Sequence, residues 1–390
     1  MTPARPDDHG KIGDIELLRG VAIIFVLLQH ARTNLFVWLP IVGTHLSLYF
    51  GFWNGVDLFF AISGFVIARS LLPSLQAAEG TTGFFRTALA FWVRRAWRLL
   101  PSAWLWLAII LVGSVVFNRS GVFMSFRSNF EATIAAVLDV ANFRQALIFG
   151  RFDPGASFPY WSLSLEEQFY ILLPFAAFAL RRWLPHALGV AILLQFFVTR
   201  TGENAGALGL WLNQLRSDAI MFGVLIALWS AHPSYRLFEP AGLRTRRFAG
   251  FAVFAFFVFC LAVVGSPVLH IVSFQVGMVA LISAVLVFLA SYDQDYLCPP
   301  GAFKRAMLWV GSRSYALYLV HIPAFFLTRE LWFRIERPGT IFDGTFTSRY
   351  ALTAIAFMVA FAELNYRLVE VPLRRRGAAI ALRIASKAQA

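Results

Sequence analysis

The chain has 390 residues, of which 59% are hydrophobic and 14% are Asp, Glu, Lys or Arg, and its mean hydropathy is +0.67. Soluble domains contain about 45–50% apolar residues, so this composition excludes an ordinary soluble protein and indicates several membrane-spanning helices. The net charge of +13 does not indicate a nucleic-acid partner, because the basic residues fall mainly between apolar segments, where orientation in the membrane explains them.

Apolar runs of about 20 residues predict a bundle of ten membrane-spanning helices, and hence an all-α integral membrane protein. The predicted spans are 15–36, 53–72, 99–118, 167–182, 184–199, 208–230, 248–264, 268–290, 308–328 and 349–369. Basic residues gather in alternate connecting segments, so the positive-inside rule places both termini in the cytosol. We expect one transmembrane domain over 1–373, a short basic cytosolic tail over 374–390, and segment 119–166 as the main extracytoplasmic feature.

The first span reads DIELLRGVAIIFVLLQH from Asp14 to His30 and contains Arg19. Arg19 and His30 are eleven residues apart, about three helical turns, so they share one face about 16 Å apart along the axis. An Arg at the centre of a spanning helix costs about 2.5–3.5 kcal/mol, so this pair predicts a functional site. The alternative is that both side chains lie near the interfaces and snorkel.

The second span begins with GVDLFFAISGF, which places Asp57 about one turn inside the membrane segment. Its carboxylate needs a partner or a proton, unless it caps the helix N-terminus. Further along, FWVRRAWRLLP places Arg95 and Arg98 on one helical face at the cytosolic entrance of the third span. Their guanidinium groups can hold phosphates there, although the positive-inside rule alone also explains their position.

The segment YWSLSLEEQFY, from Tyr160 to Tyr170, combines Ser164 with the adjacent carboxylates Glu166 and Glu167 at the start of the fourth span. Adjacent helical residues point about 100° apart, so we expect only one carboxylate to face the bundle. A glycosidase-like carboxylate pair is not implied.

Two later segments also place polar groups in or beside the membrane. Arg216 and Asp218 form a charge pair at a membrane edge, which either binds a substrate or neutralises itself. The stretch GSRSYALYLVHIP puts Ser314, Tyr318 and His321 at i, i+4 and i+7, on one face of a helix. The seven histidines include no HExxH motif and no i, i+4 pair, and the two cysteines form no CxxC, so we expect no metal site.

Together these segments resemble the acyltransferase-3 family, multi-spanning bacterial enzymes that O-acylate cell-surface polysaccharides, lipopolysaccharide or other sugars. The motifs that carry the resemblance are Leu18-Arg19-Gly20 with His30 at an R-x10-H spacing, GVDLFFAISGF, Arg94-Arg95 and Arg98 before Leu100-Pro101, WSLSLEEQFY, Arg216-x-Asp218 before Gly223, and Ser314-Tyr315 to His321. Some members carry an SGNH-type domain after the last helix, and we expect none here, since the sequence ends at Ala390.

The resemblance implies an enzyme of the bacterial inner membrane that moves an acyl group, acetyl above all, from acyl-CoA to a glycan hydroxyl. Acyl-CoA is then a co-substrate, and no permanently bound cofactor is expected. In this interpretation His30 is a general base or a transient acyl carrier, and Asp57 or Glu166 orients or charge-balances it. The remaining predicted residues bind the donor phosphates (Arg19, Arg95 and Arg98) or the acceptor (Ser164, Arg216, Asp218, Tyr318 and His321).

The alternative function is a transporter or flippase for a lipid-linked sugar, because intramembrane charges also mark transport pathways. Such a protein commonly shows related halves with broken helices in matching positions, and the sequence shows neither. A structural scaffold leaves the paired Arg19 and His30 without an explanation.

Overall fold

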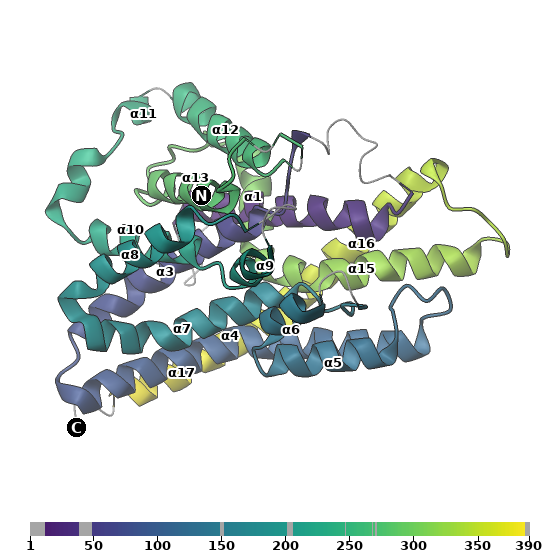
Figure 1. The fold of residues 1–390 in the computed structure, drawn as a ribbon, viewed down its shortest axis with the longest axis horizontal. Coiled ribbons are helices and arrows are strands. Elements are labelled where there is room, and N and C mark those ends of the chain that lie inside the picture. Colours follow the sequence, from purple (N-terminus) through teal and green to yellow (C-terminus); the bar gives the residue numbers. More distant parts are fainter. Residues whose placement is uncertain are drawn as a thin grey trace.

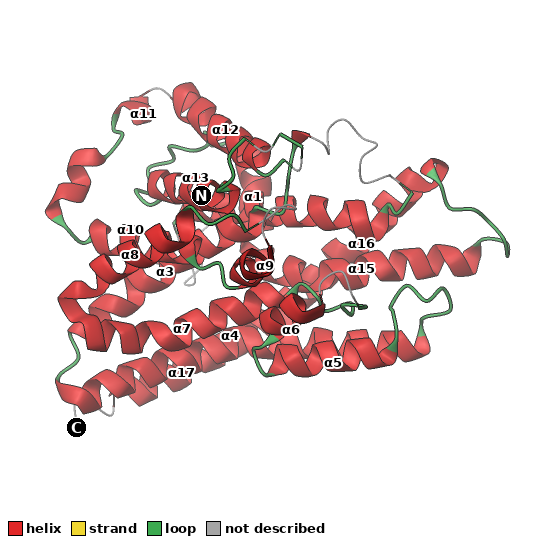
Figure 2. Ribbon diagram, viewed as in Figure 1, coloured by secondary structure: helices red, strands yellow, loops and turns green. Residues whose placement is uncertain are grey.

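The computed structural model describes residues 12–38, 49–148, 152–200, 206–245, 247–266, 268–269 and 271–386. Within these ranges every regular element is a helix (Figure 2), so the predicted all-α class is confirmed. The helices are α1 Gly13–His30, α3 Gly55–Gln76, α4 Gly80–Val116, α5 Phe126–Val137, α6 Ala141–Ile148, α7 Tyr160–Leu180, α8 Leu184–Phe196, α9 Gly206–Gln214, α10 Asp218–Ser230, α11 Gly242–Thr245, α12 Arg247–Val264, α13 Gln275–Ala290, α14 Ala302–Ser312, α15 Ser314–Ile335, α16 Thr347–Asn365 and α17 Val371–Ser386. Short π-helical turns, Ala31–Leu35 and Tyr366–Glu370, follow α1 and α16.

Several helices have the length and composition of membrane spans. In the described part of the chain, four helical stretches qualify fully: Gly55–Gln76, Gly80–Val116, Tyr160–Phe196 and Gly344–Ser386. Three shorter apolar helices are Asp218–Ser230, Phe248–Val264 and Gln275–Ala290. These helices support a multi-pass membrane protein, whereas the count of ten spans and the cytosolic location of both termini stay predictions.

The long helices run along the long axis of the molecule, as Figure 1 shows for α4, α7, α15 and the rod of α16 and α17. The short helices α5 and α6 lie towards one end, which we call the α5 end. At the other end α4 begins and α7 and α17 finish, and we call it the Gly80 end. Helix α1 runs from the interior towards the α5 end, so Arg19 and His30 lie at different depths.

Residues 374–386 of the expected basic cytosolic tail are helical and form most of α17. Helix α17 packs along α4, and its buried residues are Gly377 and Ala381, with Trp97 of α4 directly over Gly377. The basic composition of 374–390 obscured this packing, because the buried face consists of small residues four positions apart. Helix α4 starts at Gly80, before the third predicted span, which begins at residue 99.

Close packing of α3 on α10 explains two glycines of the motifs. Gly64 lies against the carbonyl of Ile220, and Gly223 lies against the carbonyl of Ala61, in each case with no room for a Cβ. Small residues allow helix backbones to approach in this way within membranes. The contact fixes the position of Asp57 and Ser63, which lie on the same helix as Gly64.

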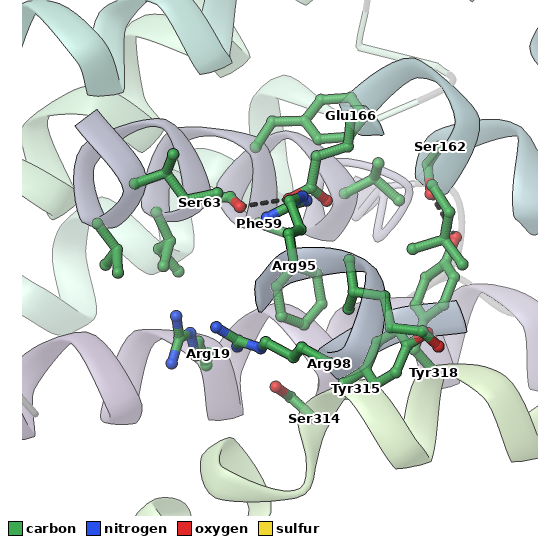
Figure 3. Close-up of a pocket in the computed structure, with 17 residues that line it drawn as sticks. Arg19, Phe59, Ser63, Arg95, Arg98, Ser162, Glu166, Ser314, Tyr315 and Tyr318 are labelled. Atoms are coloured by element: carbon green, nitrogen blue, oxygen red, sulfur yellow. Dashed lines mark hydrogen bonds and ion pairs between the residues drawn. The ribbon is translucent and has the colours of Figure 1, made fainter. Parts of the chain in front are cut away.

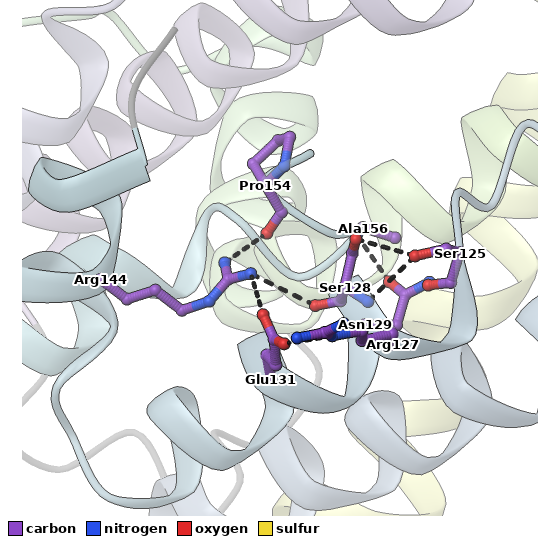
Figure 4. Close-up of polar contacts among 8 residues, drawn as sticks. All are labelled: Ser125, Arg127, Ser128, Asn129, Glu131, Arg144, Pro154 and Ala156. Carbon is purple, nitrogen blue, oxygen red and sulfur yellow. Dashed lines mark hydrogen bonds and ion pairs between the residues drawn. The ribbon is translucent and has the colours of Figure 1, made fainter. Parts of the chain in front are cut away.

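At the α5 end, polar contacts hold the segment between α4 and α7 in place (Figure 4). The Asn129 side chain donates to the carbonyl of Phe123 at 2.6 Å and accepts from the backbone N–H of Ala156 at 2.8 Å. Arg144 donates to the carbonyl of Pro154 at 2.8 Å. These contacts give segment 119–166 a defined structure over its described residues.

Candidate active site

A cavity lies between α1, α3, α4, α7 and α15 and encloses about 790 Å³, its open mouth included. We call it the first cavity. Figure 3 shows Arg19 and Arg98 at one end and Ser162 and Tyr318 at the other, with Glu166 along the wall. The cavity therefore joins residues from the R-x10-H, arginine and WSLSLEEQFY segments.

The two adjacent carboxylates both bind Arg95, contrary to the expectation that only one faces the bundle. Arg95 donates from Nε to Glu167 at 2.6 Å and from NH2 to Glu166 at 2.8 Å. The two Cα–Cβ bonds point about 100° apart, but both Glu side chains are long and the guanidinium group has donors in two directions, so both carboxylates reach it. Only Glu166 lines the first cavity, and the Ser63 hydroxyl donates to it.

Arg95 is thereby occupied by its partners. Its guanidinium also lies 4.2 Å from the centre of the Tyr170 ring, and it is 9% exposed. A guanidinium held by two carboxylates and an aromatic face has little capacity left for a phosphate. Its placement favours a positioning role towards Glu166 over the predicted binding of the donor.

His30 and His321 form a direct pair, which the sequence did not predict. His30 Nδ1 lies 2.8 Å from His321 Nε2. The ring centres are 5.0 Å apart, and the planes of the two rings are nearly parallel. His321 Nδ1 lies 2.7 Å from the carbonyl oxygen of Tyr318, and His321 is fully buried. His30 is the last α-helical residue before the π-helical turn Ala31–Leu35, a type of turn that is frequent at functional sites.

These contacts assign the tautomers of both rings. The carbonyl of Tyr318 can only accept a hydrogen bond, so His321 carries its proton on Nδ1 and presents the lone pair of Nε2. His30 must then donate from Nδ1, which leaves its Nε2 unprotonated. The hydrogen-bonded series of the Tyr318 carbonyl, His321 and His30 resembles a catalytic triad, in which a fixed group orients the imidazole that acts as base.

Tyr318 separates this pair from the first cavity. Neither histidine lines the cavity, whereas Tyr318 does, and it precedes His321 by one helical turn. The Tyr318 hydroxyl donates to the carbonyl of Pro159 and bonds Ser162 Oγ, each at 2.7 Å. A substrate in the cavity therefore approaches the histidine pair past Tyr318.

Comparison with known proteins identifies the family. A family model described as an acyltransferase domain matches residues 12–362, which contain all of the groups described above. The chain belongs to the acyltransferase-3 family. No solved structure matches it.

Curated relatives of this acyltransferase-3 chain are named O-acetyltransferases, and some of these names specify peptidoglycan. It is 24% identical over 381 residues to the peptidoglycan O-acetyltransferase OatA of Listeria monocytogenes, and 24% over 382 residues to the O-acetyltransferase OatA of Staphylococcus aureus. It is 26% identical over 396 residues to the putative peptidoglycan O-acetyltransferase YrhL of Bacillus subtilis. These matches cover 92–95% of this chain but 56–57% of each relative, so the chain spans just over half their length.

Other family motifs of this chain form a buried network outside the lining of the first cavity. Asp57 pairs with Arg216 at 3.3 Å, and Asp218 pairs with Arg200 at 2.5 Å, so Arg216 and Asp218 do not neutralise each other. Arg216 also lies between the rings of Trp53 and Trp161, 5.1 and 5.0 Å from their centres. None of the four charged residues lines the first cavity. Their placement favours a structural role, and the predicted catalytic role of Asp57 and substrate contacts of Arg216 and Asp218 stay predictions.

The WSLSLEEQFY serine at the first cavity is Ser162 and not the predicted Ser164. Ser164 accepts from the backbone N–H of Ala141 at 3.3 Å and so anchors α6, whereas Ser162 lines the first cavity. The signal for Ser162 was available, because it lies four residues before Glu166 and hence on the same helical face. Ser63 was missed as well, since one helix cannot reveal a partner on another. The described residues contain no cluster of three or more His, Cys, Asp or Glu side chains suited to a metal ion.

Proposed function

We propose that this protein is an O-acetyltransferase that moves an acetyl group from acetyl-CoA to a hydroxyl of a cell-envelope glycan. The observation that carries this proposal is the histidine pair, whose hydrogen bonds leave His30 Nε2 free to accept a proton. Membership of the acyltransferase-3 family supports the reaction class. The cell-wall names of the curated relatives support a glycan acceptor such as peptidoglycan.

The proposal that acetyl-CoA is the donor rests on the arginines at the far end of the first cavity. Arg19 and Arg98 line that end, and Arg98 forms no ion pair among the described residues. Eleven residues of helix separate Arg19 from His30 by about 16 Å, comparable to an extended pantetheine arm. Phosphates held by these arginines therefore allow the thioester to reach the histidine pair.

The proposed reaction requires one proton acceptor and one oriented nucleophile. His30 Nε2 takes the proton of the acceptor hydroxyl as its oxygen attacks the thioester carbonyl carbon. The new C–O bond forms, the C–S bond breaks, and the proton passes from His30 to the departing thiolate, so the products are the O-acetyl ester and free CoA. His321 holds the His30 ring and stabilises the imidazolium that forms between the two steps.

We further propose that the Gly80 end faces the cytosol of a bacterial inner membrane. The basic residues of this end support this orientation by the positive-inside rule. Acetyl-CoA then enters from the cytosol, and the glycan meets His30 from the α5 end. A reporter fused after Arg376 is expected to report the cytosol and one at Asp153 the outside; an outside signal after Arg376 contradicts this orientation.

Release of CoA coupled to ester formation tests the proposed activity. Purified protein in nanodiscs is incubated with radiolabelled acetyl-CoA and peptidoglycan fragments, and both free thiol and labelled glycan are measured. We expect the wild type to form both products in equal amounts and His30→Ala to form neither. Leu28→Ala serves as the matched control, because Leu28 lies on the same turn of α1 with 47% exposure. Full activity of His30→Ala would refute the proposal.

A further inference from the structure

A second cavity continues the first one towards the Gly80 end. It encloses about 1240 Å³, its open mouth included. The two cavities meet where their walls share five residues, which are Arg19, Val66, Arg98, Ser314 and Tyr315. Only the second cavity is also lined by Arg69, from α3, and Arg374, from α17.

The second cavity carries an excess of positive charge. Four arginines line it against two carboxylates, those of Glu16 and Glu370, and Glu16 is already paired with Arg19. Among the described residues, Arg69, Arg98 and Arg374 form no ion pair within 4.0 Å, and Arg98 Nε is buried without a hydrogen-bond partner. Glu370 offsets part of the charge of Arg98 and Arg374, so two guanidinium groups remain in excess of the carboxylates, and an anionic ligand would balance them.

The order of the arginines along the two cavities matches the order of the groups along CoA. The pantetheine arm ends in a diphosphate, and beyond the diphosphate lies a ribose that carries a 3′-phosphate. Arg19 and Arg98, where the cavities meet, lie at the position of the diphosphate when the arm occupies the first cavity (Figure 3). Arg69 and Arg374 then lie at the position of the more distant phosphate.

We propose that Arg69 and Arg374 form a subsite for the ribose 3′-phosphate of the donor. This inference rests on the proposed function, because it assumes that CoA is the donor. The subsite makes the protein select CoA over donors that have the same pantetheine arm without this phosphate, such as dephospho-CoA or a carrier-protein phosphopantetheine. It also gives α17 a function, since packing on α4 brings Arg374 into the cavity wall.

Comparing CoA with dephospho-CoA tests the subsite directly. Affinities of both compounds are measured by calorimetry on purified wild type, Arg69→Gln, Arg374→Gln and Arg383→Gln. Arg383 is the matched control, because it is exposed on α17 and does not line the second cavity. The ratio of the two affinities within each variant does not depend on the fraction of folded protein.

We expect the wild type to bind CoA about 10- to 100-fold more tightly than dephospho-CoA, the range for one or two charge-assisted hydrogen bonds. Arg69→Gln and Arg374→Gln should each reduce this preference while keeping the affinity for dephospho-CoA, and Arg383→Gln should retain the preference. Equal wild-type affinity for both compounds, or a preference unchanged in both cavity variants, overturns the subsite alone. Absence of binding to either compound overturns the proposed donor as well.

Discussion

Replacing His321 tests the interpretation that it orients His30. His321→Leu removes the acceptor that fixes the His30 proton on Nδ1, together with the donor to the Tyr318 carbonyl. His321→Gln keeps an amide oxygen near the position of Nε2, so it can still accept from His30. We therefore expect the Leu variant to lose much more activity than the Gln variant.

The size of the effect follows from the hydrogen bonds that are lost. His321 is fully buried, so after the change to Leu water does not readily replace the hydrogen bonds of the His30 N–H and the Tyr318 carbonyl. Leaving one buried polar group unsatisfied costs about 1–3 kcal/mol. If this cost appears in the transition state, turnover falls about 5- to 150-fold.

The assay is steady-state acetyl transfer by purified variants at varied acetyl-CoA concentration. A positioning residue for the base should lower kcat and leave the KM for acetyl-CoA nearly unchanged. Phe325→Leu is the control for packing, because the Phe325 ring contacts His321, with centres 5.9 Å apart, but donates and accepts no hydrogen bond. It should keep most of the wild-type kcat.

Two results would refute this reasoning. Equal losses in the Leu and Gln variants would show that volume, and not the acceptor, matters at this position. A rise in KM with an unchanged kcat would instead indicate that His321 binds a substrate, as the sequence first suggested.

Three further predictions concern the cavity. Glu166→Gln should lower turnover more than Glu167→Gln, since only Glu166 lines the first cavity, and equal turnover at matched expression would contradict this. His30→Ala should retain CoA binding, whereas Arg19→Ala should weaken it. Arg19→Lys should restore binding only in part, because the ammonium is a point charge and lacks the planar fork of the guanidinium. CoA titrations in which His30→Ala loses binding and Arg19→Ala keeps it would contradict these roles of His30 and Arg19. Tyr318→Phe should destabilise the protein in detergent by about 1–3 kcal/mol, because the Pro159 carbonyl and Ser162 lose a buried partner, and an unchanged melting temperature argues against those bonds.

Helical spacing predicted which groups share a face. Arg95 and Arg98, predicted to share a face of one helix, both line the first cavity, and so do Ser314 and Tyr318. These predictions succeeded because the geometry of one α-helix is fixed by its repeat. The all-α class could be predicted for a similar reason, since apolar runs of this length rarely form anything else in a membrane protein.

Pairing between helices could not be predicted in the same way. No sequence pattern pairs Asp57 with Arg216 or Asp218 with Arg200, because these pairs depend on how α3 packs on α10. The same limit explains why the proximity of His30 and His321 was missed, although both residues had been selected. Separations of nearly 300 positions are closed by packing of small residues, which local patterns do not reveal.

The difference between satisfied and unsatisfied charges separates structural from functional groups in this bundle. Burying an ion pair costs desolvation free energy, and this cost is offset only where the two charged groups are in close contact. Asp218 and Arg200 meet this condition with 0% exposure on both sides, and breaking such a pair destabilises a fold. Arg98 does not meet it, because it forms no ion pair within 4.0 Å among the described residues, and it lines both connected cavities. An anionic ligand can supply the missing negative charge, so these arginines support the proposal that the phosphates of the donor bind there.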